Sequence, residues 1–239
     1  MNIAIIPARS GSKRIPRKNI KDFCGKPILA YAIESAKSAG IFDKIIVSTD
    51  SAEIQAVARD FGAESPHLRE KYSDDFATTI DVLAYEAEHL RLQKKDCVCC
   101  IYPCTPLLRA DFLKNGFEKF LQNTARYVFS ACEYSANPLR SFFVRGDKIQ
   151  MLSECFAESR SQDLEALYFD AGQFYFGSAE NFLAKKPIFS ADSAIVKIPQ
   201  IFASDINTPE DWEIAEIKYR ILSQNLPQNP RKEAQNLAK

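Results

Sequence analysis

Positive charge is concentrated at the start of this chain. Residues 1–26 contain seven basic residues and a single acid, Asp22, so this segment carries +6 while the other 213 residues carry −6. The basic residues are Arg9, Lys13, Arg14, Arg17, Lys18, Lys21 and Lys26. Guanidinium and ammonium groups bind anions, and the turn at Ser10, Gly11 and Ser12 adds backbone N–H groups. The segment therefore predicts a site for the phosphates of a small polyanion, although a solvated basic loop would have the same composition.

The position of this loop supports the prediction more than its motif does. Residues 8–14 (ARSGSKR) match neither G-x-x-x-x-G-K-[ST] nor G-x-G-x-x-G. They directly follow the apolar segment 2–8 (NIAIIPA), which predicts a buried strand. In an open α/β sheet, ligands bind beyond the carboxyl ends of the strands, which is where this loop would lie.

Alternating strands and helices are predicted to position the loop. The expected strands cover 2–8, 44–50, 96–103, 127–132 and 194–198, and the expected helices cover 27–40, 50–62, 78–93, 110–122, 178–185 and 208–224. Asp50 with Glu53 predicts a capping box for the second helix, and Thr208-Pro209 predicts the start of the last. This alternation predicts an α/β fold, with a mostly parallel, Rossmann-like sheet and helices on both faces.

The alternation is interrupted between residues 141 and 176. Residues 141–152 predict a hairpin around Arg145-Gly146-Asp147, and 167–177 predict an aromatic strand. The FFV run and this strand would expose apolar surface in a monomer. We therefore expect one domain, 1–224, in which 141–176 form a small inserted dimerisation arm, followed by a flexible tail, 225–239.

Composition excludes several classes of protein. The chain has 239 residues, 46% hydrophobic and 26% charged, with no net charge. These values are typical of a globular protein and argue against a disordered chain or a general nucleic-acid binder. The longest apolar runs are far shorter than a membrane helix requires, and the N-terminus does not resemble a signal peptide. We expect a cytoplasmic protein without membrane or nucleic-acid partners.

The seven cysteines leave two alternatives open. Cys97 and Cys100 form a C-x-x-C, but no second pair with zinc spacing follows. On a strand, Cys97 and Cys99 would face one side and Cys100 the other, as small buried hydrophobic residues do. A structural role is favoured over metal or redox chemistry.

Four segments in order carry a family resemblance. The first contains Ala8-Arg9, Ser12-Lys13, Pro16 and Lys18-Asn19, in the pattern A-R-x-x-S-K-x-x-P-x-K-N. The others are LREKYSDDFATT (68–79), YPCTPLLR (102–109) and DINTPEDW (205–212). The chain resembles the CMP-sialic acid synthetase (acylneuraminate cytidylyltransferase) family from its start to about residue 222. The resemblance implies a GT-A-like nucleotidyltransferase sheet and an enzyme that transfers CMP from CTP to a nine-carbon sugar acid, releasing pyrophosphate.

Within this family the chain most resembles the enzymes that act on pseudaminic acid. The features are Tyr102 in place of glutamine, and the segments SANPLRSFF (135–143), SRSQDL (159–164) and DAGQFYFG (170–177). The product would serve glycan or flagellin glycosylation. The same reaction on neuraminic or legionaminic acid stays open, as does a nucleotide-binding module without catalysis. An RNA-binding protein is disfavoured by the charge of −6 outside the basic segment.

The resemblance also implies which residues contact CTP. They are Arg9, Ser10, Gly11, Ser12, Lys13, Lys18, Asn19, Arg69 and Thr79. Arg9 and Lys13 are candidate catalytic residues, because the reaction builds negative charge on the leaving pyrophosphate. The alternatives are a surface arginine for Arg69 and a helix N-cap for Thr79.

The sugar acid requires groups that hold a carboxylate and hydroxyls. The candidates are Tyr102, Arg140, Arg160, Gln162, Asp170 and Gln173. Guanidinium binds carboxylate bidentately, which favours Arg140 and Arg160, although both could be ordinary surface residues. Gln173 lies in an apolar strand and needs a polar partner there, whereas Tyr102 could equally belong to the core.

The expected cofactor is Mg²⁺. Asp205 is the main candidate ligand and a candidate catalytic residue, although it could be only a salt-bridge partner of the basic loop. Asn207 stands where the family has a second aspartate and would be a weaker, neutral ligand. The resemblance further implies a homodimer in which the partner completes each sugar site.

Overall fold

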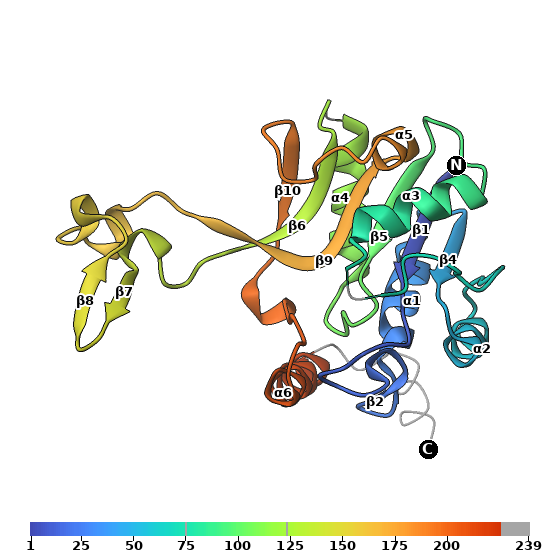
Figure 1. Cartoon of the computed structure of the whole chain (residues 1–239), viewed down its shortest axis with the longest axis horizontal. Helices are drawn as coiled ribbons and strands as arrows, with labels where there is room; N and C mark the ends of the chain where they lie inside the picture. The colour runs from blue at the N-terminus through green and yellow to red at the C-terminus, as the bar shows by residue number, and fades with distance from the viewer. Residues whose placement is uncertain (75, 123, 226–239) are drawn as a thin grey trace, which may run out of the picture.

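The computed structural model describes residues 1–74, 76–122 and 124–225. Its central sheet consists of β1 (Asn2–Pro7), β4 (Lys44–Ser48), β5 (Cys97–Ile101), β6 (Tyr127–Glu133), β9 (Tyr168–Ser178) and β10 (Ser193–Lys197). The strand order is β10-β6-β9-β5-β1-β4 (Figure 1). Neighbouring strands pair in parallel except at β9, which is antiparallel to β5 and β6. The predicted α/β class with a mostly parallel sheet is confirmed.

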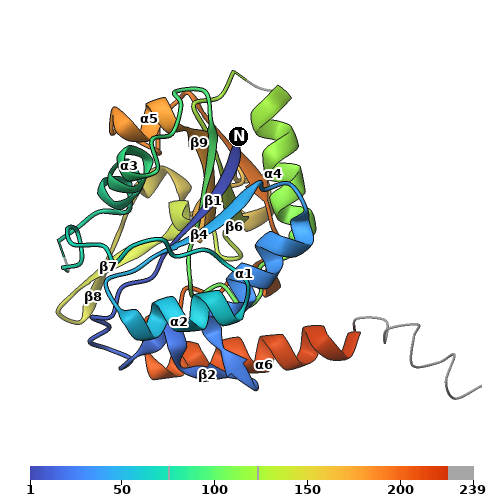
Figure 2. The same cartoon turned by 90° about the vertical axis from the view of Figure 1, so that its right-hand side faces the viewer.

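Helices cover both faces of the sheet, as predicted. They are α1 (Ile28–Ala39), α2 (Ala52–Asp60), α3 (Thr79–His89), α4 (Ala110–Gln122), α5 (Ala179–Leu183) and α6 (Pro209–Asn225). Helices α1, α2 and α4 pack on one face, and α3 and α5 on the other (Figure 2). Strand residues alternate between the two cores: Ile6 of β1 faces α1, whereas Ile5 packs on the side of α3.

The cysteines of β5 follow this alternation. Cys97 and Cys99 pack in the core under α1 and α4, and Cys100 packs in the opposite core. All the described cysteines are free thiols, and burial raises the pKa of Cys97 to about 12. Among the described residues, no three His, Cys, Asp or Glu side chains are grouped so that they could hold a metal ion. The predicted alternation of these cysteines between the two cores is confirmed.

Two helix starts differ in detail from the sequence pattern. Helix α2 is capped by Ser51, whose hydroxyl accepts from the N–H of Ile54 at 3.4 Å, so the predicted cap at Asp50 is wrong. The Asp50 carboxylate instead bonds to Ser10. Helix α3 is capped by Thr78, which leaves the side chain of Thr79 available for other contacts.

Helix α6 closes the fold beneath the basic loop. Trp212 of α6 meets Phe23 edge-on with ring centroids 5.4 Å apart, and Tyr219 meets the same ring at 5.7 Å. These contacts bury a small separate core that also includes Ile206. Thr208 accepts a hydrogen bond from the N–H of Asp211 at 3.2 Å, which confirms the predicted helix start. Residues 204–207 are thereby held beside the loop. Every helix in the described ranges is too short or too polar to cross a bilayer.

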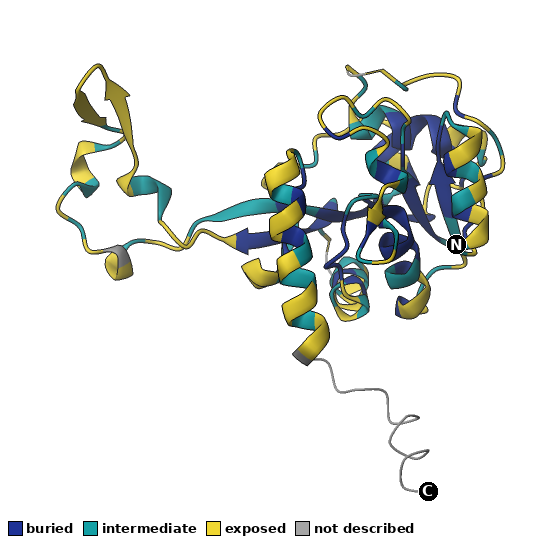
Figure 3. Ribbon diagram, turned by 90° about the horizontal axis from the view of Figure 1, so that it is seen from below, coloured by how far each residue is buried: buried dark blue, intermediate teal, exposed yellow. Residues whose placement is uncertain are grey.

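A hairpin arm projects from the body (Figure 1). It contains β7 (Phe142–Arg145) and β8 (Lys148–Met151), paired antiparallel as predicted. The arm is largely exposed, in contrast to the buried sheet (Figure 3). Most of strand β9 falls within the predicted insertion 141–176, but the strand belongs to the central sheet, where it pairs with β5 and β6 and packs aromatic side chains in both cores. The predicted tail, 225–239, lies outside the described residues apart from its first.

Candidate active site

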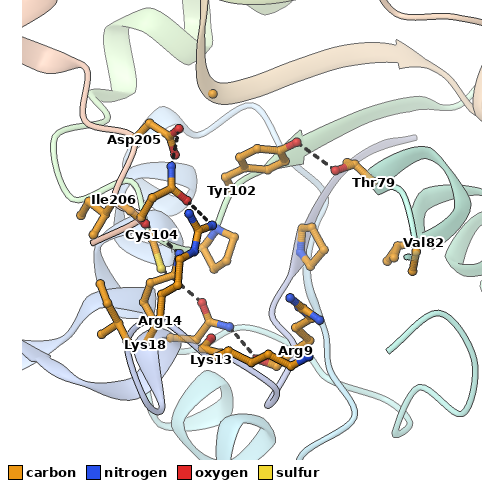
Figure 4. A pocket seen from close by; sticks show the side chains of 18 of the residues that line it. Arg9, Lys13, Arg14, Lys18, Thr79, Val82, Tyr102, Cys104, Asp205 and Ile206 are labelled. Atoms are coloured by element: carbon orange, nitrogen blue, oxygen red, sulfur yellow. Dashed lines mark hydrogen bonds between the residues drawn. The ribbon is translucent and has the colours of Figure 1, made fainter. Parts of the chain in front are cut away.

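A pocket of about 560 Å³ opens at the carboxyl ends of β1 and β5 (Figure 4). The basic loop, the start of α3 and the segment before α6 meet there, as expected for an open α/β sheet. Ten of the predicted site residues line it: Arg9, Ser12, Lys13, Lys18, Asn19, Arg69, Thr79, Tyr102, Asp205 and Asn207. Sequence segments separated by nearly 200 residues thus form one cavity.

The basic loop is fixed by contacts on both sides. The Asp50 carboxylate accepts from the N–H of Ser10 at 2.8 Å and from its hydroxyl at 2.7 Å. On the other side, the Asn19 amide donates to the carbonyl of Arg9 at 2.8 Å and accepts from the Cys104 thiol at 3.2 Å. Ser10 therefore anchors the loop and, like Gly11, does not line the pocket. Arg9 and Lys13 therefore line the pocket from a loop whose backbone is held in place.

The basic segment also holds the opposite wall. Lys18 Nζ donates to the carbonyl of Ile206 at 2.8 Å, and Arg14 Nη2 donates to Asn207 Oδ1 at 2.8 Å. Asn207 Nδ2 donates in turn to Asp205 Oδ2 at 2.6 Å (Figure 4). The loop and the segment before α6 thus form one hydrogen-bonded unit, with an exposed carboxylate at Asp205.

A third wall consists of hydroxyl groups at the ends of β5 and α3. Thr79 Oγ1 and the Tyr102 hydroxyl are 2.8 Å apart (Figure 4). Behind them, the Tyr175 hydroxyl donates to Asp170 Oδ2 at 2.5 Å. Burial raises the pKa of Asp170, a shift that the Tyr175 hydrogen bond opposes. Tyr102 and Thr79 are thus hydrogen-bond partners at the wall of the pocket, and the Tyr102 ring also packs against the core.

A bulge in β9 brings backbone into the pocket. Gly172 has φ 62, a left-handed conformation that favours glycine, and its N–H donates to Asp170 Oδ1 at 2.9 Å. The pairing with β6 shifts register between Phe129 and Ala131, and the Ser130 hydroxyl accepts the N–H of Gln173 at 3.3 Å. Gly172 consequently lines the pocket while Asp170 lies behind it.

Arg69 is a buried residue and not a surface arginine. It is 4% exposed, and its Nη1 donates to the Ser48 hydroxyl at 2.7 Å. Burial lowers the pKa of its guanidinium, and the negative charges of Asp50 and Glu86 oppose that shift. A buried cation that lines a pocket is a strong candidate for binding an anionic or polar ligand.

The remaining sugar-site candidates do not reach this pocket within one chain. Arg140, Arg160 and Gln162 lie on the projecting arm, where Arg160 Nε donates to Asp163 at 2.7 Å. Gln173 is 1% exposed, and its Nε2 donates to the carbonyl of Phe202 at 2.5 Å, whereas its Oε1 has no hydrogen-bond partner among the described residues.

Several pocket residues were not predicted from the sequence. Arg14, Tyr72, Asp74 and Gly172 line the cavity, and Asp50 anchors the loop without lining it. Two of these residues could have been predicted. Arg14 belongs to the basic segment, and Gly172 is a glycine within an aromatic strand, where glycine often marks a bulge or a close approach of a ligand.

Comparisons with known proteins agree with this architecture. The family model described as cytidylyltransferase matches residues 3–197. The chain belongs to the cytidylyltransferase family. It is 44% identical over 224 residues to a pseudaminic acid cytidylyltransferase of Campylobacter jejuni, covering 92% of this chain and 97% of that protein. It is 33% identical to the CMP-N,N'-diacetyllegionaminic acid synthase of Legionella pneumophila, covering 90% and 94% of the two chains.

The fold has known relatives at much lower identity. A solved CMP:2-keto-3-deoxy-manno-octonic acid synthetase superposes with a TM-score of 0.69 at 16% identity, covering 94% of this chain and 99% of that one. This likeness concerns the fold alone. The predicted nucleotidyltransferase fold and the predicted family are both confirmed, and this cytidylyltransferase has its pocket at the sheet edge where the sequence placed it.

Proposed function

We propose that this cytidylyltransferase transfers CMP from CTP to the anomeric hydroxyl of pseudaminic acid and releases pyrophosphate. The observation that carries the proposal is the 44% identity, over nearly the whole of both chains, to a pseudaminic acid cytidylyltransferase. The pocket supports it, since the basic loop, the buried Arg69 and the Asp205 carboxylate face one cavity. Cationic side chains bind the phosphates of a nucleoside triphosphate, and a carboxylate can bind the Mg²⁺ that accompanies it.

The reaction needs positioning and charge stabilisation. The anomeric oxygen attacks the α-phosphorus, the bond from that phosphorus to the bridging oxygen breaks, and pyrophosphate leaves with the electron pair. The proton of the anomeric hydroxyl passes to solvent. Arg9 and Lys13, on the fixed basic loop, would contact the phosphates and offset the charge that grows on the leaving group. Thr79 and Arg69 would contact the nucleoside from the other side of the cavity.

Mg²⁺ fits the donors that are present. Asp205 offers an exposed carboxylate in the pocket, whereas the oxygen of Asn207 already accepts from Arg14. We therefore assign Asp205, and not Asn207, as the protein ligand, with triphosphate oxygens completing the site. When bound, Mg²⁺ would neutralise part of the charge on the departing pyrophosphate.

The arm supports a homodimer. Phe142 is 53% exposed and Val144 68%, and Ile149 on the facing strand is 63% exposed. An isolated two-stranded hairpin is marginally stable in water, so this one requires a surface to pack against. In a homodimer the arm of one chain would bring Arg140, Arg160 and Gln162 to the pocket of the other. These residues would then bind the carboxylate of the sugar acid.

The free cysteines support a cytoplasmic location. The chain carries free thiols, including an exposed one at Cys155, without a disulfide among the described residues. Such thiols persist in the reducing cytoplasm, where CTP is available.

Turnover on a sugar panel tests the proposal. The purified protein is incubated with CTP, Mg²⁺ and, separately, pseudaminic, N-acetylneuraminic and N,N'-diacetyllegionaminic acid, and pyrophosphate release and product mass are measured. We expect a CMP-sugar product, with a higher kcat/KM for pseudaminic acid than for either of the other two acids. The third acid is the relevant competitor, because a CMP-N,N'-diacetyllegionaminic acid synthase is 33% identical to this chain. A higher kcat/KM for this acid than for pseudaminic acid would make it the substrate instead. CTP binding without pyrophosphate release would indicate a non-catalytic nucleotide-binding module.

A further inference from the structure

A carboxylate is buried directly behind the pocket. Glu86 lies in the C-terminal half of α3 and is 0% exposed. Its Oε1 accepts a hydrogen bond from the Ser48 hydroxyl at 2.6 Å. The same hydroxyl accepts from Arg69 Nη1 at 2.7 Å, and Arg69 lines the pocket. The chain Glu86–Ser48–Arg69 therefore runs from the core of the protein to the wall of the cavity.

This arrangement is costly as a purely structural device. An ionised carboxylate without contact with water is unfavourable unless it is paired and fully hydrogen-bonded. Here Glu86 Oε2 and Arg69 Nε, one acceptor and one donor, lack hydrogen-bond partners among the described residues. His67 Nε2 lies 3.4 Å from Glu86 Oε1 but makes no hydrogen bond with it. Apolar residues of similar size would fill this space at lower cost, so stability alone does not account for the network.

The electrostatics of the pocket supply a reason for it. Arg9 and Arg69 line the same cavity, and the positive charge of Arg9 acts on the Arg69 guanidinium. Two cations that face one cavity repel each other until an anionic ligand arrives. Glu86 and Asp50 are the negative charges that act on Arg69 from behind. Arg69 Nη1 also donates to the Ser48 carbonyl at 3.0 Å, so the Ser48 hydroxyl and Glu86 add a second restraint to the same guanidinium.

We propose that Glu86 is a positioning residue that acts through the Ser48 hydroxyl to hold Arg69 against the nucleotide. The inference rests on the proposed role of this pocket in binding CTP. Preorganisation of this kind lowers the cost of ordering a binding group when the ligand arrives, and small misplacements have large effects. Because Arg69 does not contact the leaving group in this proposal, its displacement should weaken binding of CTP and leave the chemical step largely intact.

Two substitutions test the link, with a matched control. Glu86→Gln keeps the shape and removes the charge, and Ser48→Ala removes the hydroxyl that joins Glu86 to Arg69. We expect both to raise the KM and the calorimetric Kd for CTP, on the order of 10- to 100-fold, with kcat and the KM for the sugar acid within a few-fold of wild type. The control is Asp96→Asn, another buried carboxylate, which bonds to the N-terminal amine at 2.9 Å and does not line the pocket. It should lower the melting temperature without changing the Kd for CTP.

A double-mutant cycle separates positioning from a general structural effect. If Glu86 acts through Arg69, then Glu86→Gln should have no further effect on the Kd for CTP in an Arg69→Gln background. Should Glu86→Gln fail to fold alone, Ser48→Ala, which alters no charge, decides the matter. The proposal is overturned if Ser48→Ala binds CTP within twofold of wild type, or if Glu86→Gln weakens binding equally in both backgrounds. CTP binding is measured without turnover, so a wild-type protein that binds CTP but releases no pyrophosphate contradicts the proposed function and not this inference.

Discussion

The side-chain amide of Asn207 donates a hydrogen bond to the Asp205 carboxylate at 2.6 Å, and this contact constrains how each residue can bind a metal ion. The amide oxygen faces Arg14, a donor, and the amide nitrogen faces a carboxylate, an acceptor. Reversing the amide would place oxygen against the carboxylate and nitrogen against the guanidinium, so the partners determine its orientation. Asn207 thereby connects the basic loop to the proposed metal ligand, and the Arg14 cation beside its amide oxygen disfavours a second cation there.

The first prediction concerns metal dependence. Asn207→Asp adds a carboxylate beside Asp205, and a divalent cation relieves their repulsion, so the Mg²⁺ concentration for half-maximal rate should fall. Asp205→Asn should abolish most activity, with partial recovery in excess Mg²⁺. Asn207→Ala is the matched control, because it removes the bridge without adding charge. Mg²⁺ titrations of the initial rate and calorimetry of Mg²⁺ binding check this. An Asp205→Asn protein with unchanged rate and unchanged Mg²⁺ dependence would make this carboxylate structural.

The second prediction concerns Lys13. Lys13→Ala should lower kcat on the order of 10²–10³-fold with a smaller effect on the KM for CTP, because Lys13 is placed to meet charge that develops on pyrophosphate. Lys21→Ala is the control from the same basic segment, since Lys21 Nζ lies 4.6 Å from the centre of the Trp212 ring and does not line the pocket. Steady-state kinetics of both variants decide it. A kcat for Lys13→Ala within a few-fold of wild type would reduce Lys13 to a surface residue.

The regular part of the fold could be predicted because its signals are local. The apolar runs of β1 and β5 and the faces of α1 and α3 follow fixed periods, and Gly40 ends α1 in a left-handed conformation. The boundary of the insertion was harder, since β9 differs from its neighbours in direction and in aromatic content. Its place in the sheet depends on pairing with β5 and β6, which no local pattern encodes.

The site was predicted where a motif exists and missed where contacts are long-range. Asp50 fits a local capping pattern with Glu53, but its partner is Ser10, 40 residues away. Arg69 was predicted as a nucleotide contact and lines the pocket, but its burial was not predicted. Its segment is polar, and the side chain is held by Ser48, which Glu86 contacts from another element. Arg140 and Arg160 were chosen for their chemistry, and their distance from the pocket appears only once the arm is placed.

The third prediction concerns stability and pH. Hydrogen bonds from the N–H of Asn207 and from Thr208 lower the pKa of Asp211 below its usual 3.8. A lowered carboxyl pKa gives stability that is present above about pH 4 and lost as pH falls through the folded-state value. Asp211→Asn should therefore lower the melting temperature at pH 7 by about 1–3 °C, with little difference from wild type near pH 2. Glu210→Gln, the neighbouring acid, is the control. Equal effects of Asp211→Asn at both pH values would contradict the charge-based account.

The last prediction concerns sharing of the site between chains. Arg160 lies on the arm and Lys13 in the pocket, so a homodimer with exchanged arms would pair the Arg160 of one chain with the Lys13 of the other. Lys13→Ala and Arg160→Ala should each have low activity alone. In a mixed dimer, the chain that keeps Lys13 receives the arm that keeps Arg160, so one site is complete. Random pairing of equal amounts should restore on the order of a quarter of the wild-type rate.

The mixing experiment uses chains that are co-expressed with different tags or exchanged in mild denaturant, with the dimer verified by light scattering. The matched control mixes Lys13→Ala with Asp205→Asn, two residues that line one pocket of one chain. Because the mixed dimer then has one defect in each pocket, no activity should return. Recovery in the first mixture and not in the second would demonstrate that the arm completes the site of its partner. A failure of the first mixture to recover activity, or an active monomer at micromolar concentration, would show that each chain builds its sugar site alone.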